Sequence, residues 1–110
     1  MGDIYTSGTW KPNAGSEDAF VEAWAEFAAW ASAIDGAGTL RLVRDQQQPD
    51  YYVSFGDWES ADAAQAWKNL PEFSEQLANV LQHVAEFHST TMAVCATAEA
   101  GTSSVHAPVA

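Results

Sequence analysis

The chain has 110 residues and a formal net charge of −11, with 47% hydrophobic residues. This length fits one domain, and the apolar content is too high for a disordered chain. Fifteen acidic residues face only four basic ones, so the surface would repel phosphate backbones and lacks a polybasic face for anionic lipids. We therefore expect neither a nucleic acid nor a membrane as a partner.

Cysteine usage and the N-terminal sequence indicate the compartment. The single Cys95 cannot form an internal disulfide, so nothing favours an oxidising environment. The N-terminal residues lack the basic and apolar regions of a signal peptide, and no apolar run approaches the ~20 residues of a membrane span. We expect a cytoplasmic protein.

The first part of the chain predicts a strand, a helix and a second strand. Residues 4–11 are rich in Tyr, Thr and Trp, which favour strands, and residues 12–15 have turn chemistry. Ser16 is a suitable N-cap for a helix whose apolar residues recur at intervals of four and three. These residues are Phe20, Trp24, Phe27, Ala31 and Ile34. Residues 35–38 end the helix, and residues 39–44 predict the second strand.

The second part predicts a strand, a helix in two pieces and a last strand. A polar hairpin loop over residues 45–50 leads into a strand over residues 51–58. Ser60 caps the next helix, which breaks and restarts at Pro71 because proline is tolerated only where a helical segment begins. The apolar residues of the two pieces are Ala63, Ala66, Trp67, Leu70, Phe73, Leu77, Val80, Leu81 and Val84. Residues 86–97 become strand-like.

This order predicts an α+β fold of the ferredoxin-like, split βαβ kind, with an antiparallel sheet and two helices on one face. We assign the folded domain to residues 1–97, and residues 98–110 to a tail that is flexible or contacts a partner. Both faces of the third strand carry a large aromatic residue. One face has Tyr51, Val53 and Phe55, and the other has Tyr52, Ser54 and Gly56. Because the helices cover one face, we expect a homodimer that packs sheet against sheet.

Sequence motifs argue against several kinds of catalytic site. His83, His88 and His106 are scattered without a second ligand at helical or hairpin spacing, so we expect no metal site. The sequence has no Gly-x-Ser-x-Gly elbow, no Gly-rich phosphate loop and no dinucleotide fingerprint. We therefore expect no bound cofactor.

The aromatic residues instead indicate a pocket. The chain has more large rings than a core of this size packs routinely. They are Trp24, Phe27, Trp30, Tyr52, Trp58, Trp67 and Phe73. One interpretation is that most of them form ordinary core. The functional interpretation is a cavity between helices and sheet that binds a flat aromatic molecule, oriented by Tyr hydroxyl and Trp N–H groups.

Three local sequences, in this order and spacing, resemble the antibiotic biosynthesis monooxygenase family. They are Arg41–Asp45, Ser54–Ser60 and Trp67–Phe73. The resemblance covers about residues 5–97. It implies a dimeric α+β barrel, and an oxygenase that oxidises phenolic or polyketide-like aromatic substrates with molecular oxygen and without metal or flavin.

Two branches of this family suggest site residues by position. In members that oxidise polycyclic phenols, a Trp at the end of the third strand matches Trp58 here. The Asn position of those members is Ser54, which still offers a hydrogen bond, and their Tyr position is Ala64, which does not.

In members that degrade haem, a Trp on the second helix matches Trp67. Their Asn position falls near Gly8, and their His position is Leu77, which cannot ligate iron. We therefore expect no haem degradation.

The resemblance and the aromatic residues together define the expected site, with Trp58 and Ser54 as catalytic residues. The residues expected to bind substrate are Trp67, Tyr52, Trp24, Phe27, Phe73, Leu77 and His88. Such an enzyme must hold a phenolate-type anion in a dry site, deprotonate it and stabilise its charge. The candidates for these tasks are Ser54, Tyr52, His88, Arg41 and Arg44. The alternative is a non-catalytic barrel that binds small aromatic ligands or acts in stress, and the departures at Ser54 and Ala64 favour it.

Overall fold

The computed structural model describes residues 2–100 and 102–105, which form three helices and six strands. In chain order the elements are β1 (Ile4–Pro12), α1 (Glu17–Ser32), β2 (Ala37–Arg44), β3 (Tyr52–Trp58), α2 (Ala61–Lys68), α3 (Pro71–Leu81), β4 (Val84–Ala93), β5 (Ala96–Glu99) and β6 (Thr102–Val105). Among the described residues, no helix is long and apolar enough to cross a bilayer.

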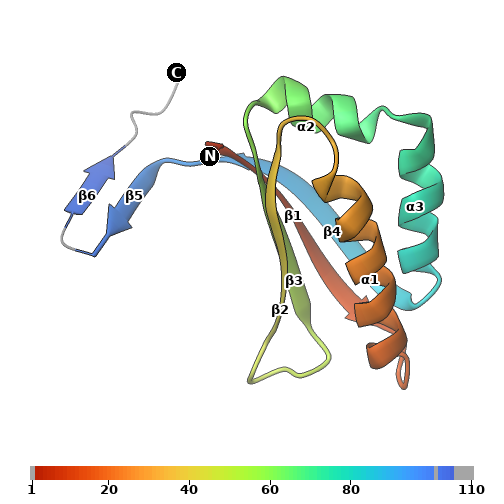
Figure 1. Ribbon diagram of the computed structural model, residues 1–110. Coiled ribbons are helices and arrows are strands. Elements are labelled where there is room, and N and C mark those ends of the chain that lie inside the picture. The colour runs from red at the N-terminus through yellow and green to blue at the C-terminus, as the bar shows by residue number, and fades with distance from the viewer. Residues whose placement is uncertain (1, 101, 106–110) are drawn as a thin grey trace.

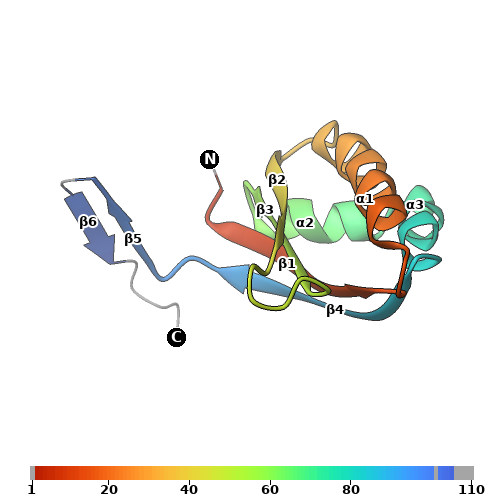
Figure 2. The same ribbon diagram turned by 90° about the horizontal axis from the view of Figure 1, so that it is seen from below.

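The main sheet has the strand order β2-β3-β1-β4, and every neighbouring pair in it is antiparallel. Helices α1, α2 and α3 all lie on the same face of this sheet (Figures 1 and 2). The predicted ferredoxin-like α+β fold is therefore confirmed. The second predicted helix is divided at Pro71 into α2 and α3, as the sequence indicated, so the structure has three helices in its described part.

The helix ends follow the local sequence closely. The hydroxyl of Ser60 accepts a hydrogen bond from the Ala63 N–H at 3.0 Å, which caps α2. Pro71 opens α3, and Leu70 before it has the extended backbone that a following proline favours. Ser16 stands at the N-cap of α1, but its side chain makes no capping hydrogen bond.

Side chains alternate between two faces of the sheet, as expected from the period of two. On β3, residues Tyr52, Ser54, Gly56 and Trp58 are buried toward the helices, whereas the residues between them are half-buried on the other face. The same alternation on β1 buries Thr6, Gly8 and Trp10. The core lies between the sheet and the helices, where Trp58, Phe20 and Val80 are completely buried.

The opposite sheet face, which we call the open face, carries apolar residues with no helix over them (Figure 2). Its apolar residues on the four strands include Tyr5, Val43, Val53, Phe55 and Met92. Val43 and Met92 are 45% and 46% exposed. Register places Val43 opposite Val53, so that the apolar residues adjoin one another across strands.

The C-terminal part departs from the predicted boundaries. Strand β4 ends at Ala93 rather than near residue 97, and a separate hairpin of β5 and β6 follows it. This hairpin projects away from the main sheet (Figures 1 and 2). The sequence predicted no regular structure here, because residues 98–110 lack an apolar period. The hairpin is instead held by the backbone pairing of its two strands. Residues 106–110 of the predicted tail lie outside the described residues.

Candidate functional site

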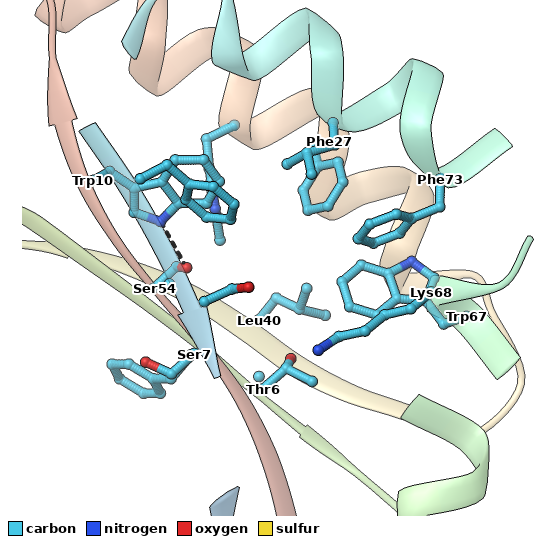
Figure 3. A pocket seen from close by; sticks show the side chains of 16 residues that line it. Thr6, Ser7, Trp10, Phe27, Leu40, Ser54, Trp67, Lys68 and Phe73 are labelled. Atoms are coloured by element: carbon cyan, nitrogen blue, oxygen red, sulfur yellow. Dashed lines mark hydrogen bonds between the residues drawn. The ribbon is translucent and has the colours of Figure 1, made fainter. Parts of the chain in front are cut away.

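A cavity of about 130 Å³ lies between the helix-covered face of the sheet and the helices (Figure 3). Its walls come from all four strands of the main sheet and from all three helices. The side chains that matter below are Thr6, Trp10, Ser54 and Ser89 from the strands, and Trp24, Phe27, Trp67, Lys68, Phe73 and Leu77 from the helices. The lining therefore combines several aromatic rings with hydroxyl groups on the sheet side.

Gly8 in β1 keeps this cavity open at its floor. A Cβ atom there would lie 2.9 Å from Trp10 Nε1 and 3.0 Å from Ser54 Oγ, closer than van der Waals contact allows. Gly8 also faces Ser54 directly across the β1–β3 register. Any side chain at this position would displace the polar pair that borders the cavity.

Two indole N–H groups donate to hydroxyls on the sheet. Trp10 Nε1 donates to Ser54 Oγ at 2.9 Å, and Trp58 Nε1 donates to Thr6 Oγ1 at 3.0 Å. Both hydroxyls are buried. Because a hydroxyl that accepts still has its own proton to donate, Ser54 and Thr6 offer hydrogen-bond donors to a bound ligand.

Lys68, the last residue of α2, brings a positive charge to the cavity. Its Nζ donates to Thr91 Oγ1 at 3.1 Å. Figure 3 shows this nitrogen directed toward the Thr6 side of the cavity. Among the described residues that line the cavity there is no aspartate, glutamate or histidine, so Lys68 is the ionisable group of this lining.

Trp67 forms one aromatic wall and lies over Trp58. The two indoles are stacked with centroids 4.8 Å apart, and Phe73 meets Trp67 edge to face at 4.9 Å. Trp67 is 4% exposed, and its Nε1 has no hydrogen-bond partner in the described part of the chain. Figure 3 shows this nitrogen on the side of the ring nearer Phe73.

Six of the nine expected site residues line the cavity. They are Ser54, Trp67, Trp24, Phe27, Phe73 and Leu77. They come from β3 and the three helices, and the fold brings them together because each lies on the core-facing side of its element.

Trp58, Tyr52 and His88 lie elsewhere. Trp58 is 0% exposed beneath Trp67, so it supports the cavity wall without lining it. Tyr52 packs edge to face on Phe20 at 5.1 Å, near the other end of β3. His88 is exposed, because its register opposite Thr9 places it on the open face.

The two candidate arginines are also away from the cavity. Arg44 lies over the Tyr52 ring at 5.4 Å and donates to the backbone oxygen of Pro49. Arg41 is exposed and pairs in register with Phe55. Asp45 accepts hydrogen bonds from the N–H groups of the loop that follows it. Arg44 and Asp45 thus hold the loop at the end of the β2–β3 hairpin.

The sequence did not point to Thr6, Trp10, Lys68 and Ser89 as site residues. Thr6 and Trp10 share the face of β1 with Gly8, so strand alternation contained the signal once the buried face was known. Lys68 directly follows Trp67, but the sequence pattern does not show where its side chain ends. Its long side chain turns back over the sheet to reach Thr91.

One titrating group outside the cavity is perturbed. Burial raises the pKa of Asp57, but hydrogen bonds from the N–H groups of Thr39 and Gly2 outweigh this and hold the pKa below its ordinary value of 3.8. The carboxylate ties the start of β2 and the N-terminus to β3. Across the described chain, no group of three or more His, Cys, Asp or Glu residues could hold a metal ion.

Comparison with known proteins adds sequence and structural relatives. The family model for antibiotic biosynthesis monooxygenases matches residues 4–79. No curated protein matches the sequence. SnoaB, a cofactor-independent oxygenase from Streptomyces nogalater, is 16% identical with a TM-score of 0.76, over 86% of this chain and 94% of SnoaB.

Two further solved structures have the same fold. A protein from Bordetella bronchiseptica that is classed as an antibiotic biosynthesis monooxygenase is 21% identical with a TM-score of 0.74, over 84% of this chain and 96% of its own. Rv0793 from Mycobacterium tuberculosis is 16% identical with a TM-score of 0.70, over 82% and 92% of the two chains. At these identities the likeness concerns the fold.

Proposed function

Because the chain belongs to the antibiotic biosynthesis monooxygenase family, we propose that it oxidises a phenolic or polyketide-like aromatic with molecular oxygen and without a cofactor. The observation that carries the proposal is the cavity itself, which combines aromatic walls with hydroxyl donors on the sheet. Aromatic walls bind a flat ring and exclude water. The donors stabilise the negative charge of a phenolate-type substrate.

In this reaction the substrate supplies the electrons. Oxygen takes up four electrons from the aromatic anion and its reacting carbon, so that one oxygen atom enters the product and the other leaves as water. The chain has to bind the anion, keep it dry and stabilise its charge. We assign the hydrogen bond to the phenolate oxygen to Ser54, whose Oγ already accepts from Trp10 and has its proton free to donate.

Trp58 has a supporting role in this proposal. Its stacking on Trp67 and its bond to Thr6 fix the indole wall and the hydroxyl beside it. Trp67, Trp24, Phe27, Phe73 and Leu77 provide the apolar surface for the ring.

Oxygen uptake tests the proposed reaction. The protein is incubated with a panel of anthrones and hydroquinones without added metal, and oxygen consumption is followed with an electrode. We expect uptake above the rate of autoxidation, and a reduction of at least several-fold in Ser54→Ala. Uptake equal to the protein-free control for every compound would refute the reaction.

The second candidate is a non-catalytic barrel that binds small aromatic ligands. The observation that favours it is the absence of a carboxylate or imidazole from the cavity lining among the described residues, because a general base must lie within hydrogen-bond reach of the proton it removes. Tight binding of the panel without oxygen uptake would support this candidate.

We also propose that the protein is a homodimer that buries the open face, with the C-terminal arm against the partner. The apolar residues of that face and the projecting β5–β6 hairpin support this assembly. Light scattering at micromolar concentration would give twice the 11.8 kDa of one chain. A mass of one chain at that concentration would rule the dimer out.

A further inference from the structure

We infer that the cavity selects a compact, single-ring aromatic anion, and that Lys68 holds the anionic oxygen of this ligand. The inference deepens the proposed function, since it rests on the same aromatic pocket and names the class of ligand.

The charge of the lining is opposite to that of the chain. Acidic residues outnumber basic ones by fifteen to four overall, yet the cavity is lined by one lysine and by no described acidic residue. An anion is repelled by most of this molecule's surface. The cavity therefore offers an aromatic anion a cation beside apolar walls, with no described acidic residue in the same lining.

Lys68 has bonding capacity left for a ligand. An ammonium group has three N–H donors, and the hydrogen bond to Thr91 uses one. Within residues 2–100 and 102–105, no carboxylate forms an ion pair with Lys68, whereas Lys11 Nζ lies 3.8 Å from carboxylate oxygens of both Asp50 and Glu86. Thr91 therefore holds the Lys68 side chain over the cavity without neutralising its charge. An anionic ligand oxygen can accept a charge-assisted hydrogen bond from a remaining N–H group of Lys68.

The size of the cavity limits the aromatic system. A dry cavity of ~150 Å³ in another protein binds benzene. The cavity here measures about 130 Å³, and it is bounded by large rings that pack on one another. One six-membered ring fits this volume, whereas a fused three-ring system would have to extend beyond it through the open side of the cavity.

The chemistry of the lining favours a ligand that enters already ionised. The polar groups of the cavity are hydroxyls and one ammonium, and none of its described residues is a carboxylate or an imidazole that could remove a proton. A carboxylate on the ring is ionised at neutral pH, and its oxygen suits an ammonium donor. A single-ring hydroxybenzoate has all of these properties.

Calorimetric titrations under anaerobic conditions test the inference without requiring turnover. The probes are 2,5-dihydroxybenzoate, its neutral isostere 2,5-dihydroxybenzamide, and anthrone as a three-ring compound. We expect the wild-type protein to bind the benzoate at least tenfold more tightly than the benzamide, and anthrone more weakly than either. This comparison uses the unaltered protein, so it does not depend on how any variant folds.

Variants assign the effect to the lysine. Lys68→Met should weaken benzoate binding at least tenfold and change benzamide binding less than twofold, whereas Lys68→Arg should retain most of the preference. Lys11→Met is the matched control, because it removes a cation that lies outside the cavity. It should leave both affinities unchanged. Thermal melts of each variant verify folding.

Three results would overturn the inference. Equal affinity of the wild-type protein for benzoate and benzamide would show that charge is not selected. Equal losses for both ligands in Lys68→Met would assign Lys68 to packing. Tighter binding of anthrone than of the benzoate would likewise contradict the size limit. Charge-selective binding without oxygen uptake would sustain this inference while refuting the monooxygenase reaction, so the two failures are distinguishable.

Discussion

The stacked pair of Trp58 and Trp67 allows a sharp test of the cavity, because the two indoles adjoin but differ in their surroundings. Trp58 is completely buried and donates to Thr6 at 3.0 Å, whereas Trp67 borders the cavity and its N–H has no hydrogen-bond partner among the described residues. Replacement of each by phenylalanine removes the same atoms. The loss in free energy of unfolding should nevertheless differ between the two variants.

The magnitudes follow from these contacts. Trp58→Phe loses a buried hydrogen bond, worth about 1 kcal/mol. It also leaves a void of about 40 Å³, which costs about 1 kcal/mol on top of the lost transfer energy of the missing atoms. The total is about 3 kcal/mol. Trp67→Phe loses no hydrogen bond, removes an unsatisfied donor whose burial costs about 1 kcal/mol, and enlarges a cavity that already exists. Its net cost should be about 0–1 kcal/mol.

Equilibrium unfolding in urea measures this contrast. With a slope of roughly 2 kcal/mol per molar, the midpoint of Trp58→Phe should fall by about 1 M more than that of Trp67→Phe. Protein concentration must be held constant, since association would shift both midpoints. Ligand affinity should show the reverse order, with a several-fold loss in Trp67→Phe and little change in Trp58→Phe. Equal unfolding costs, or a binding loss confined to Trp58→Phe, would refute the assignment of the two rings.

Three further outcomes are expected. The pKa of Asp57 is lowered in the folded state, so the stabilisation by its carboxylate is present above the unfolded value of 3.8 and is lost as pH falls through the folded pKa. Asp57→Asn should therefore lower the free energy of unfolding by about 1 kcal/mol at pH 7, measured by urea melts. The difference from wild type should vanish in acid. Gly8→Ala should weaken aromatic-ligand binding in titrations, because its Cβ would lie 2.9 Å from Trp10 Nε1. Val43→Glu on the open face should dissociate the dimer in light scattering, whereas Val21→Glu, at a similarly exposed residue of α1, should not.

The fold was predictable because its signals are local. The restart of the helix at Pro71, the cap at Ser60 and the alternation along β3 all follow from backbone chemistry and side-chain period. The β5–β6 hairpin was not predicted, because its small polar residues have no apolar pattern and its order comes from pairing of the backbone.

The site was predictable only in part. The positions of Trp24, Trp67 and Ser54 on core-facing sides followed from periodicity, and all three line the cavity. Periodicity cannot tell which of two stacked rings meets the cavity, so both Trp58 and Trp67 were expected at the site, and of the two it is Trp67 that lines the cavity. Nor does it show where a long side chain ends, which is why Lys68 was missed although its neighbour was singled out.

The acidity of the chain and the cation in its cavity together predict an unusual dependence on salt. Surface carboxylates repel an approaching anion over distances that salt screens, since the Debye length is about 8 Å at 0.15 M. A ligand oxygen bonded directly to Lys68 would lie well within one Debye length of the ammonium, so this attraction is screened less than the repulsion from distant carboxylates. Added salt should therefore accelerate the association of 2,5-dihydroxybenzoate while its dissociation rate changes little, whereas a complementary protein surface would give slower association. Stopped-flow kinetics at 20 and 200 mM sodium chloride, with the benzamide as neutral control, measure both rates. An association rate for the benzoate that falls with salt would show that the field at the cavity mouth is positive, and that the acidic surface does not govern entry.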